Sequence, residues 1–110
     1  MAAAGAIRAS AGDLLRFLAA SLSPPDAPPG PALALAAAPR VTINKRMALG
    51  LGWMVLRRKD KPEIVCHNGG TWGFRSFAAM IPRSRAAVVV LTNSARSVDR
   101  LGMKLVDAAG

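Results

Sequence analysis

Apolar residues near the start of the chain recur at the spacing of one helix face. Ser10 precedes this stripe and Asp13 follows three residues later, which is the pattern of an N-cap with an acidic first turn. The pattern therefore predicts an amphipathic helix that begins just after Ser10. Its apolar stripe consists of Leu14, Leu15, Phe17, Leu18 and Leu22.

Prolines interrupt the pattern directly after this helix. Five prolines stand between residues 23 and 31, and each lacks a backbone donor and fixes its own φ, so neither a helix nor a central strand can continue. We expect residues 23–40 to form a surface connection. Within it, residues 31–38 can form a short helix rich in Ala and Leu, which Pro39 ends.

The second half of the chain has the pattern of β-strands. Extended apolar or alternating runs occupy residues 49–55, 63–67, 74–81 and 86–91. A charged turn at 57–61 joins the first two runs, and a tight turn at 82–85 joins the last two. The run at 86–91 is apolar on both faces, as in a buried central strand, which implies cover on both faces and favours a neighbouring strand on each edge. The sequence offers only one obvious neighbour for it.

The last segment again has helical spacing. Ser97 is a suitable N-cap, and Val98, Leu101, Leu105 and Val106 would share one face of the helix that follows. The element order is then helix, connection, four strands and helix, without an internal repeat. This order predicts the α+β class, with an antiparallel β meander flanked by an N-terminal and a C-terminal helix in one domain over residues 1–110.

Composition narrows the classes of function. The 110 residues are 52% hydrophobic and 19% charged, which is typical of a globular chain. The net charge of +9 raises nucleic acid as a partner, but the basic residues are scattered, and the cluster at 57–61 is broken by Asp60, as in a solvated turn. With 5% aromatic residues and no Tyr, few rings are available to stack on bases, so specific nucleic-acid binding is not expected.

The chain also offers little for a metal or a membrane. A single cysteine, Cys66, allows no internal disulfide, and with one histidine no Cys/His zinc site can form, so we expect neither a metal nor a cofactor. No apolar run approaches the ~20 residues of a membrane span, and no signal peptide is visible, which as written suggests the cytoplasm.

The most unusual local sequence is Val-Cys-His-Asn-Gly-Gly-Thr-Trp-Gly-Phe at residues 65–74. Gly-Leu-Gly-Trp at 50–53 precedes it, and Val-Val-Val-Leu-Thr-Asn at 88–93 follows it. Together these runs resemble the C-terminal part of class C β-lactamases and their esterase and peptidase relatives. The resemblance covers nearly all of the chain, including the helix at 11–18 and the start of the last helix, and it implies a partial β-lactamase/transpeptidase-like fold.

The resemblance also implies roles for the residues of this run. The third active-site motif of that family reads Lys-Thr-Gly, and His67, Asn68 and Gly69 stand in its place. Gly70 would then supply a backbone N–H to the oxyanion formed during acyl transfer. Gly69, Thr71 and Trp72 would line the substrate, which in such relatives is a β-lactam, an ester or a peptide.

Two further motifs of the family are absent from these residues. There is no Tyr for a Tyr-x-Asn motif, and no Ser has a Lys three residues later; Ser97 is followed by Arg100, which stays protonated. We therefore expect a C-terminal fragment or truncated product that is inactive alone, with a complementary N-terminal part as a possible partner. Full-length relatives are often periplasmic or secreted.

Less specific interpretations remain beside this one. Trp53 is expected to be a core ring and Cys66 a small buried hydrophobe, whereas the position of Trp72 is left open. The alternative function is a non-enzymatic module that pairs with a partner through an unfilled sheet edge. A third possibility is binding of nucleic acid by charge alone.

Overall fold

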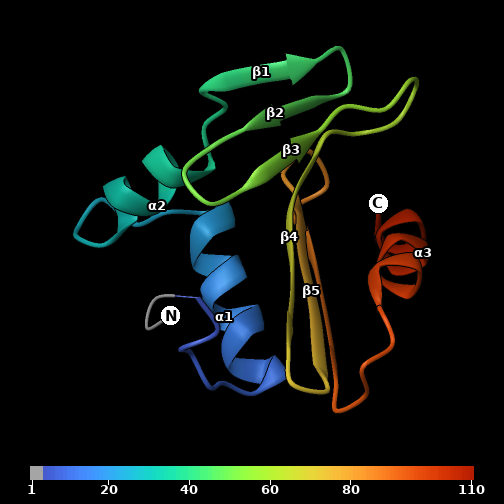
Figure 1. The fold of residues 1–110 in the computed structure, drawn as a ribbon. Coiled ribbons are helices and arrows are strands. Elements are labelled where there is room, and N and C mark those ends of the chain that lie inside the picture. The colour runs from blue at the N-terminus through green and yellow to red at the C-terminus, as the bar shows by residue number, and fades with distance from the viewer. Residues whose placement is uncertain (1–3) are drawn as a thin grey trace.

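A computed structural model describes residues 4–110 and contains one sheet between helices (Figure 1). The helices are α1 (Ala11–Leu22), α2 (Gly30–Ala37) and α3 (Asp99–Ala109). The strands are β1 (Val41–Asn44), β2 (Met47–Leu49), β3 (Met54–Leu56), β4 (Ile64–Thr71), β5 (Phe74–Ile81) and β6 (Ala86–Thr92). All neighbours are antiparallel and the strand order follows the chain, so the predicted α+β meander is confirmed.

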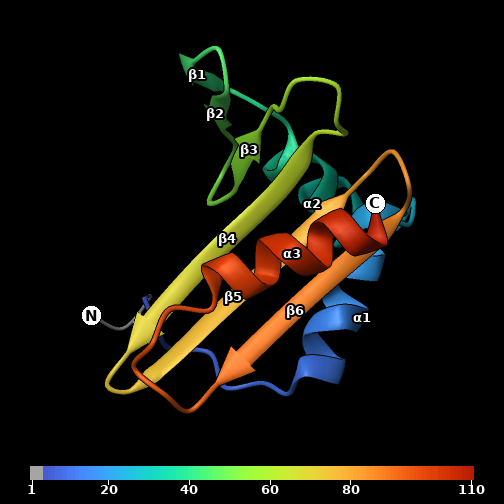
Figure 2. The same ribbon diagram turned by 90° about the vertical axis from the view of Figure 1, so that its right-hand side faces the viewer.

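The helices cover opposite faces of the sheet. α1 packs on β5 and β6 from one side and α3 packs on them from the other, as Figure 2 shows with α3 in front. Val65 and Met80 face α1 with Leu18, whereas Cys66 and Phe77 face α3. Burial of these two apolar layers stabilises the fold at roughly 25 cal/mol per Å² of apolar surface.

The N-terminus of α1 is capped as predicted, whereas that of α3 differs from the prediction. The hydroxyl of Ser10 accepts a hydrogen bond from the N–H of Asp13 at 3.1 Å, which confirms the predicted N-cap of α1. Ser97 accepts from the N–H of Asp99 at 3.2 Å, but the helix itself begins at Asp99 with Val98 as its N-cap. The predicted N-cap of the last helix was therefore one residue early.

The structure has six strands where four were predicted. β1 and β2 form an additional hairpin, whose turn is closed by Asn44 Oδ1 accepting from the N–H of Arg46 at 2.8 Å. The predicted strand at 49–55 is wrong, because the chain turns between β2 and β3. Gly52 has φ +79°, and the N–H of Leu51 donates to the carbonyl of Ala36 at 2.9 Å. Glycine spacing in this run thus marks a turn and a close approach to α2.

β4 and β6 also differ from expectation. β4 continues through the two glycines to Thr71, instead of ending at His67, because each of these residues has a partner on β5. β6 pairs only with β5 and is the last strand of the sheet in the described residues, although its composition predicted a central strand. The two helices cover its faces, which explains an apolar sequence at an edge.

The buried face of α3 is rotated from the predicted one. Gly102 and Val106 face the sheet, whereas Leu101 and Leu105 are exposed. A Cβ at position 102 would lie 2.2 Å from Cδ1 and 2.5 Å from Cγ of Phe77, so glycine at this position is what allows α3 to approach the ring.

We therefore predict that Gly102→Ala lowers the free energy of unfolding by about 1–3 kcal/mol, because the overpacked ring of Phe77 must move. Gly12→Ala in α1 is the matched control, since its Cβ would have no atom closer than 3.8 Å. The control should raise stability, by up to about 1 kcal/mol. Urea unfolding followed by circular dichroism measures both, and equal effects of the two variants would contradict this account of helix packing.

Candidate functional site

The motif at residues 67–71 lies on a strand edge that is open in the described part of the chain. β3 pairs with β4 only at Ile64, Val65 and Cys66, and these three residues are buried. The remaining five residues of β4 pair with β5 on one side, have no strand on the other, and are all exposed. Both long helices pack mainly over β5 and β6, so neither of them covers this edge (Figure 2).

The turn after β4 decides which backbone groups face the open edge. Trp72 and Gly73 form a two-residue hairpin turn, and both have positive φ, +41° and +97°, as in a type I′ turn. The flanking residues Thr71 and Phe74 then form a hydrogen-bonded pair. Because such pairs alternate along an antiparallel ladder, Gly69 directs its N–H and C=O toward β5, and Gly70 directs them outward.

The side chains of the motif lie on both faces of β4. His67 has its side chain on the α1 face and is exposed, whereas Asn68 lies on the α3 face by strand alternation. Nδ2 of Asn68 donates to Oδ2 of Asp99 at 2.8 Å, where α3 begins. This bond leaves the carbonyl oxygen of the Asn68 amide as an acceptor for a ligand.

The end of the hairpin adds a large exposed ring. Trp72 is fully exposed, with a relative exposure of 101%, and Phe74 beside it is also exposed. Thr71 contacts the segment before α1, because a Cβ on Gly5 would lie 2.7 Å from Cγ2 of Thr71. The sequence-predicted residues 67–72 are thus brought together along one edge and hairpin tip.

Two residues near this edge had not been identified from the sequence. Arg75 is the cross-strand partner of Gly70, and a Cβ on Gly70 would lie 2.1 Å from Nη1 of Arg75. Asp99 meets Asn68 from 31 positions away. The only sequence signals were an Arg soon after the glycines and an acidic residue at a helix start, and neither signal reveals the contact.

The other candidate residues lie away from the edge. Cys66 is 1% exposed, and this burial, followed by the charge of Asp99, raises the pKa of its thiol to about 11, so the interpretation as a buried hydrophobe is confirmed. Trp53 is partly buried, packs against the α1 side of the core and stacks on Phe17 with ring centroids 6.4 Å apart.

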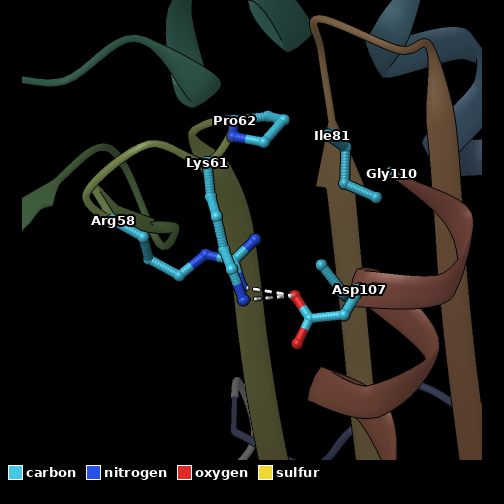
Figure 3. Close-up of a pocket in the computed structure, with 7 residues that line it drawn as sticks. Arg58, Lys61, Pro62, Ile81, Asp107 and Gly110 are labelled. Carbon is cyan, nitrogen blue, oxygen red and sulfur yellow. Dashed lines mark hydrogen bonds and ion pairs between the residues drawn. The ribbon is translucent and has the colours of Figure 1, made fainter.

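A separate hollow of about 220 Å³ lies between the β3–β4 loop and the end of α3 (Figure 3). Nη1 of Arg58 lies 2.5 Å and Nζ of Lys61 lies 3.6 Å from Oδ1 of Asp107. The hydrogen bond from Arg58, with smaller contributions from Lys61, lowers the pKa of Asp107. Arg58 and Lys61 therefore tie the loop to α3. Lys59, Asp60 and Lys61 are nevertheless exposed, as expected for the solvated turn predicted from the sequence.

Neither a metal cluster nor a membrane span is formed by residues 4–110. No three His, Cys, Asp or Glu side chains in this range gather closely enough to hold a metal ion. Likewise, none of the three described helices is both long and apolar enough to cross a bilayer.

Comparison with known proteins agrees with the family suggested by the edge motif. The chain is similar to D-alanyl-D-alanine-carboxypeptidase/endopeptidase AmpH of Escherichia coli K12 and of Escherichia coli O157:H7, with 43% identity over 53 residues in each case. These residues make up 46% of this chain and only 14% of either relative. The family model described as Beta-lactamase matches residues 1–109. The chain therefore belongs to the β-lactamase family and is a relative of serine hydrolases.

Proposed function

We propose that these residues form one wall of an acyl-transfer site, with Gly70 as an oxyanion donor. The observation that carries this proposal is the open β4 edge at residues 67–71, on which ladder alternation turns the backbone of Gly70 outward. A carbonyl that approaches such an edge meets an N–H at hydrogen-bond distance without a side chain in the way. The charge that develops on the carbonyl oxygen would be stabilised there.

The neighbouring side chains have complementary tasks in this proposal. His67, in the place of the family's Lys, orients or polarises the substrate from the α1 face. Asn68 is held by Asp99 and presents its amide oxygen to a donor on the substrate. Gly69 keeps β4 paired with β5, and Thr71 and Trp72 line the substrate at the hairpin end. Esters, amides and β-lactams all contain the acyl group that this edge would bind.

We further propose that the attacking hydroxyl and its base lie in polypeptide beyond these 110 residues. Within them, no Ser has a Lys three positions later and there is no Tyr to serve as a second acid or base. The open edge would then face a complementary N-terminal part, in the same polypeptide or in a partner chain. This chain would act as the C-terminal portion of one β-lactamase-related domain.

The 110-residue chain alone should not hydrolyse nitrocefin or p-nitrophenyl acetate faster than buffer does. In a longer form that includes a Ser-x-x-Lys segment, turnover should appear, and His67→Ala should lower kcat/KM by about 10²–10⁴-fold. Thr42→Ala, on the exposed strand β1, is the control and should leave kcat/KM unchanged. Absorbance assays measure both, and turnover by the short chain that survives His67→Ala would contradict the proposal.

A pair of proline variants tests the direction of the backbone groups. Gly70→Pro removes an N–H that faces the open edge, and its Cβ displaces only the flexible side chain of Arg75. The fold should therefore persist while the longer form loses about 10²–10³-fold in kcat. Gly69→Pro removes an N–H that faces β5 and should cost about 1–3 kcal/mol of stability. Urea unfolding and the same absorbance assays separate the two effects. If Gly70→Pro unfolds the sheet more than Gly69→Pro does, the alternation assigned to this edge is wrong.

The edge formed by β6 favours a second candidate, a module that pairs with a partner strand without catalysis. β6 has seven residues, is apolar, and has no neighbour on its outer side among the described residues. An unpaired apolar edge of this length is a template for another strand. This candidate and the hydrolase proposal are compatible, because a complementary part could pair at β6 and still supply the nucleophile.

Edge pairing predicts that the isolated chain self-associates. Its apparent mass in size-exclusion chromatography with light scattering should rise with protein concentration. Two substitutions place a charge on β6. Val90→Lys does so at a half-buried position on the α3 face, whereas Leu91→Lys does so at an exposed position on the α1 face. Leu91→Lys should reduce association without unfolding the chain, and Arg83→Lys in the β5–β6 turn is the charge-neutral control. A stable monomer at all concentrations would remove this candidate.

A further inference from the structure

We propose that the β1–β2 hairpin is a docking surface for an anionic phospholipid bilayer, which it contacts from outside without crossing it. The inference goes beyond the acyl-transfer proposal, because it concerns the opposite end of β4 from the hairpin tip at Trp72. The surface comprises strand β1, the turn that follows it and the exposed part of the β3–β4 loop. We name it the basic hairpin surface, and its residues are Val41, Ile43, Lys45, Arg46 and Lys59.

The hairpin projects from the body of the protein. Figure 1 shows β1 above the helices, at the end of the sheet. α1 and α3 pack on β5 and β6, and within residues 4–110 β1 pairs only with β2. Every residue from 41 to 46 is exposed, including the β-branched side chains of Val41 at 56% and Ile43 at 52%. Neighbouring apolar side chains that remain in water on a projecting element are typical of a surface that binds a partner.

Backbone pairing brings two basic segments together beside these apolar side chains. The N–H of Arg57 donates to the carbonyl of Arg46 at 2.8 Å, so the β3–β4 loop begins next to the β1–β2 turn. The two segments contain six of the 15 Lys and Arg residues of the chain, namely Lys45, Arg46, Arg57, Arg58, Lys59 and Lys61. Three carboxylates accompany them, those of Asp60 and of the ion-pair partners Glu63 and Asp107. Six cations and three carboxylates leave a local net charge of +3.

A hollow at the turn is suited to a phospholipid headgroup. It has a volume of about 410 Å³ and is lined by Asn44, Lys45, Arg46, Met47 and Leu56. Lys45 and Arg46 would donate to the oxygens of the lipid phosphate. Met47 and Leu56, which are half-buried, place apolar surface beside these cations. Cationic and apolar groups in contact match the boundary between headgroups and acyl chains.

The apolar residues favour a bilayer over a nucleic acid as the anionic partner. Lys and Arg side chains would bind the phosphates of either one. Val41 and Ile43, however, gain free energy when they leave water, which the interfacial region of a bilayer allows and the phosphate backbone of a duplex does not. The basic hairpin surface also contains no aromatic ring that could stack on a base.

Docking at this surface would leave the open edge of β4 free. The β3–β4 loop precedes β4, and the hairpin tip at Trp72 follows it. At ~3.4 Å per residue, the eight residues of β4 place these two ends about 25 Å apart. Since charges are screened within ~8–10 Å at physiological salt, cations near the hairpin tip should contribute little to docking.

The test is co-sedimentation of the 110-residue chain with lipid vesicles. Vesicles of phosphatidylcholine and phosphatidylglycerol in equal parts should bind the chain at least about tenfold more tightly than vesicles of phosphatidylcholine alone. Binding to the anionic vesicles should weaken as the salt concentration rises, because salt screens the attraction between the cations and the lipid headgroups.

Three variants separate the contributions to this binding. Lys45→Gln combined with Arg46→Gln should lower the partition coefficient for anionic vesicles by about tenfold or more. Ile43→Ser leaves the charge unchanged and should lower it by about threefold or more. The matched control is Arg96→Gln combined with Arg100→Gln, which removes the same charge from exposed positions beyond the far end of β6. It should change the partition coefficient by less than about twofold.

Circular dichroism spectra verify that each variant is folded. Equal losses in the two double variants would overturn the proposal, because binding would then follow net charge rather than this surface. Wild-type partition of Ile43→Ser, with duplex DNA bound as tightly as the vesicles, would assign the surface to nucleic acid instead. Neither result depends on turnover by the longer form, so failure here is distinguishable from failure of the proposed function.

Discussion

The antiparallel pairing of β4 with β5 is the interaction on which the rest of the structure depends. The seven paired positions, closed by the two-residue turn at Trp72 and Gly73, fix the register of the whole motif. A shift of one residue would turn Gly70 toward β5 and move His67 to the α3 face. The type I′ turn therefore selects which of two adjacent glycines directs its backbone N–H and C=O to the open edge.

The site begins where the core ends. Along β4, Ile64, Val65 and Cys66 are buried between the two helix layers, and every later residue of the strand is exposed. The exposed half is nevertheless held in place, because its partners on β5 include Phe77, which is 4% exposed and contacts Gly102 of α3. The open half of β4 is therefore anchored to the core through its backbone pairing with β5.

The sequence was most informative where periodicity and local chemistry coincide. The helix after Ser10 and the two later strands could be predicted because each depends on neighbours within a few residues. The burial of Cys66 could be predicted from strand alternation and its apolar character, although the residues that bury it come from β5, β6 and α3. The predicted strand ended at residue 67, before Gly69 and Gly70, since glycines weaken strands, and only their partners on β5 reveal that the strand continues. Arg75 and Asp99 could not be found in this way, because their contacts depend on register and on where α3 begins.

The apolar sequence of β6 shows how strand composition reports burial of faces before it reports pairing of edges. Val88 is buried against the α3 layer, and Val89 packs with the α1 layer, so both faces of the strand are covered although its outer edge is open. The predicted cover of both faces is thus confirmed, whereas the second neighbouring strand expected at the edge is not among the described residues. The open outer edge of β6 and the open edge of β4 point in opposite directions within the plane of the sheet, with β5 between the two strands. A complementary part that contacted both the β6 edge and the open half of β4 would have to cross one face of the sheet. It would then place a new strand beside β6 and a reacting group beside Gly70.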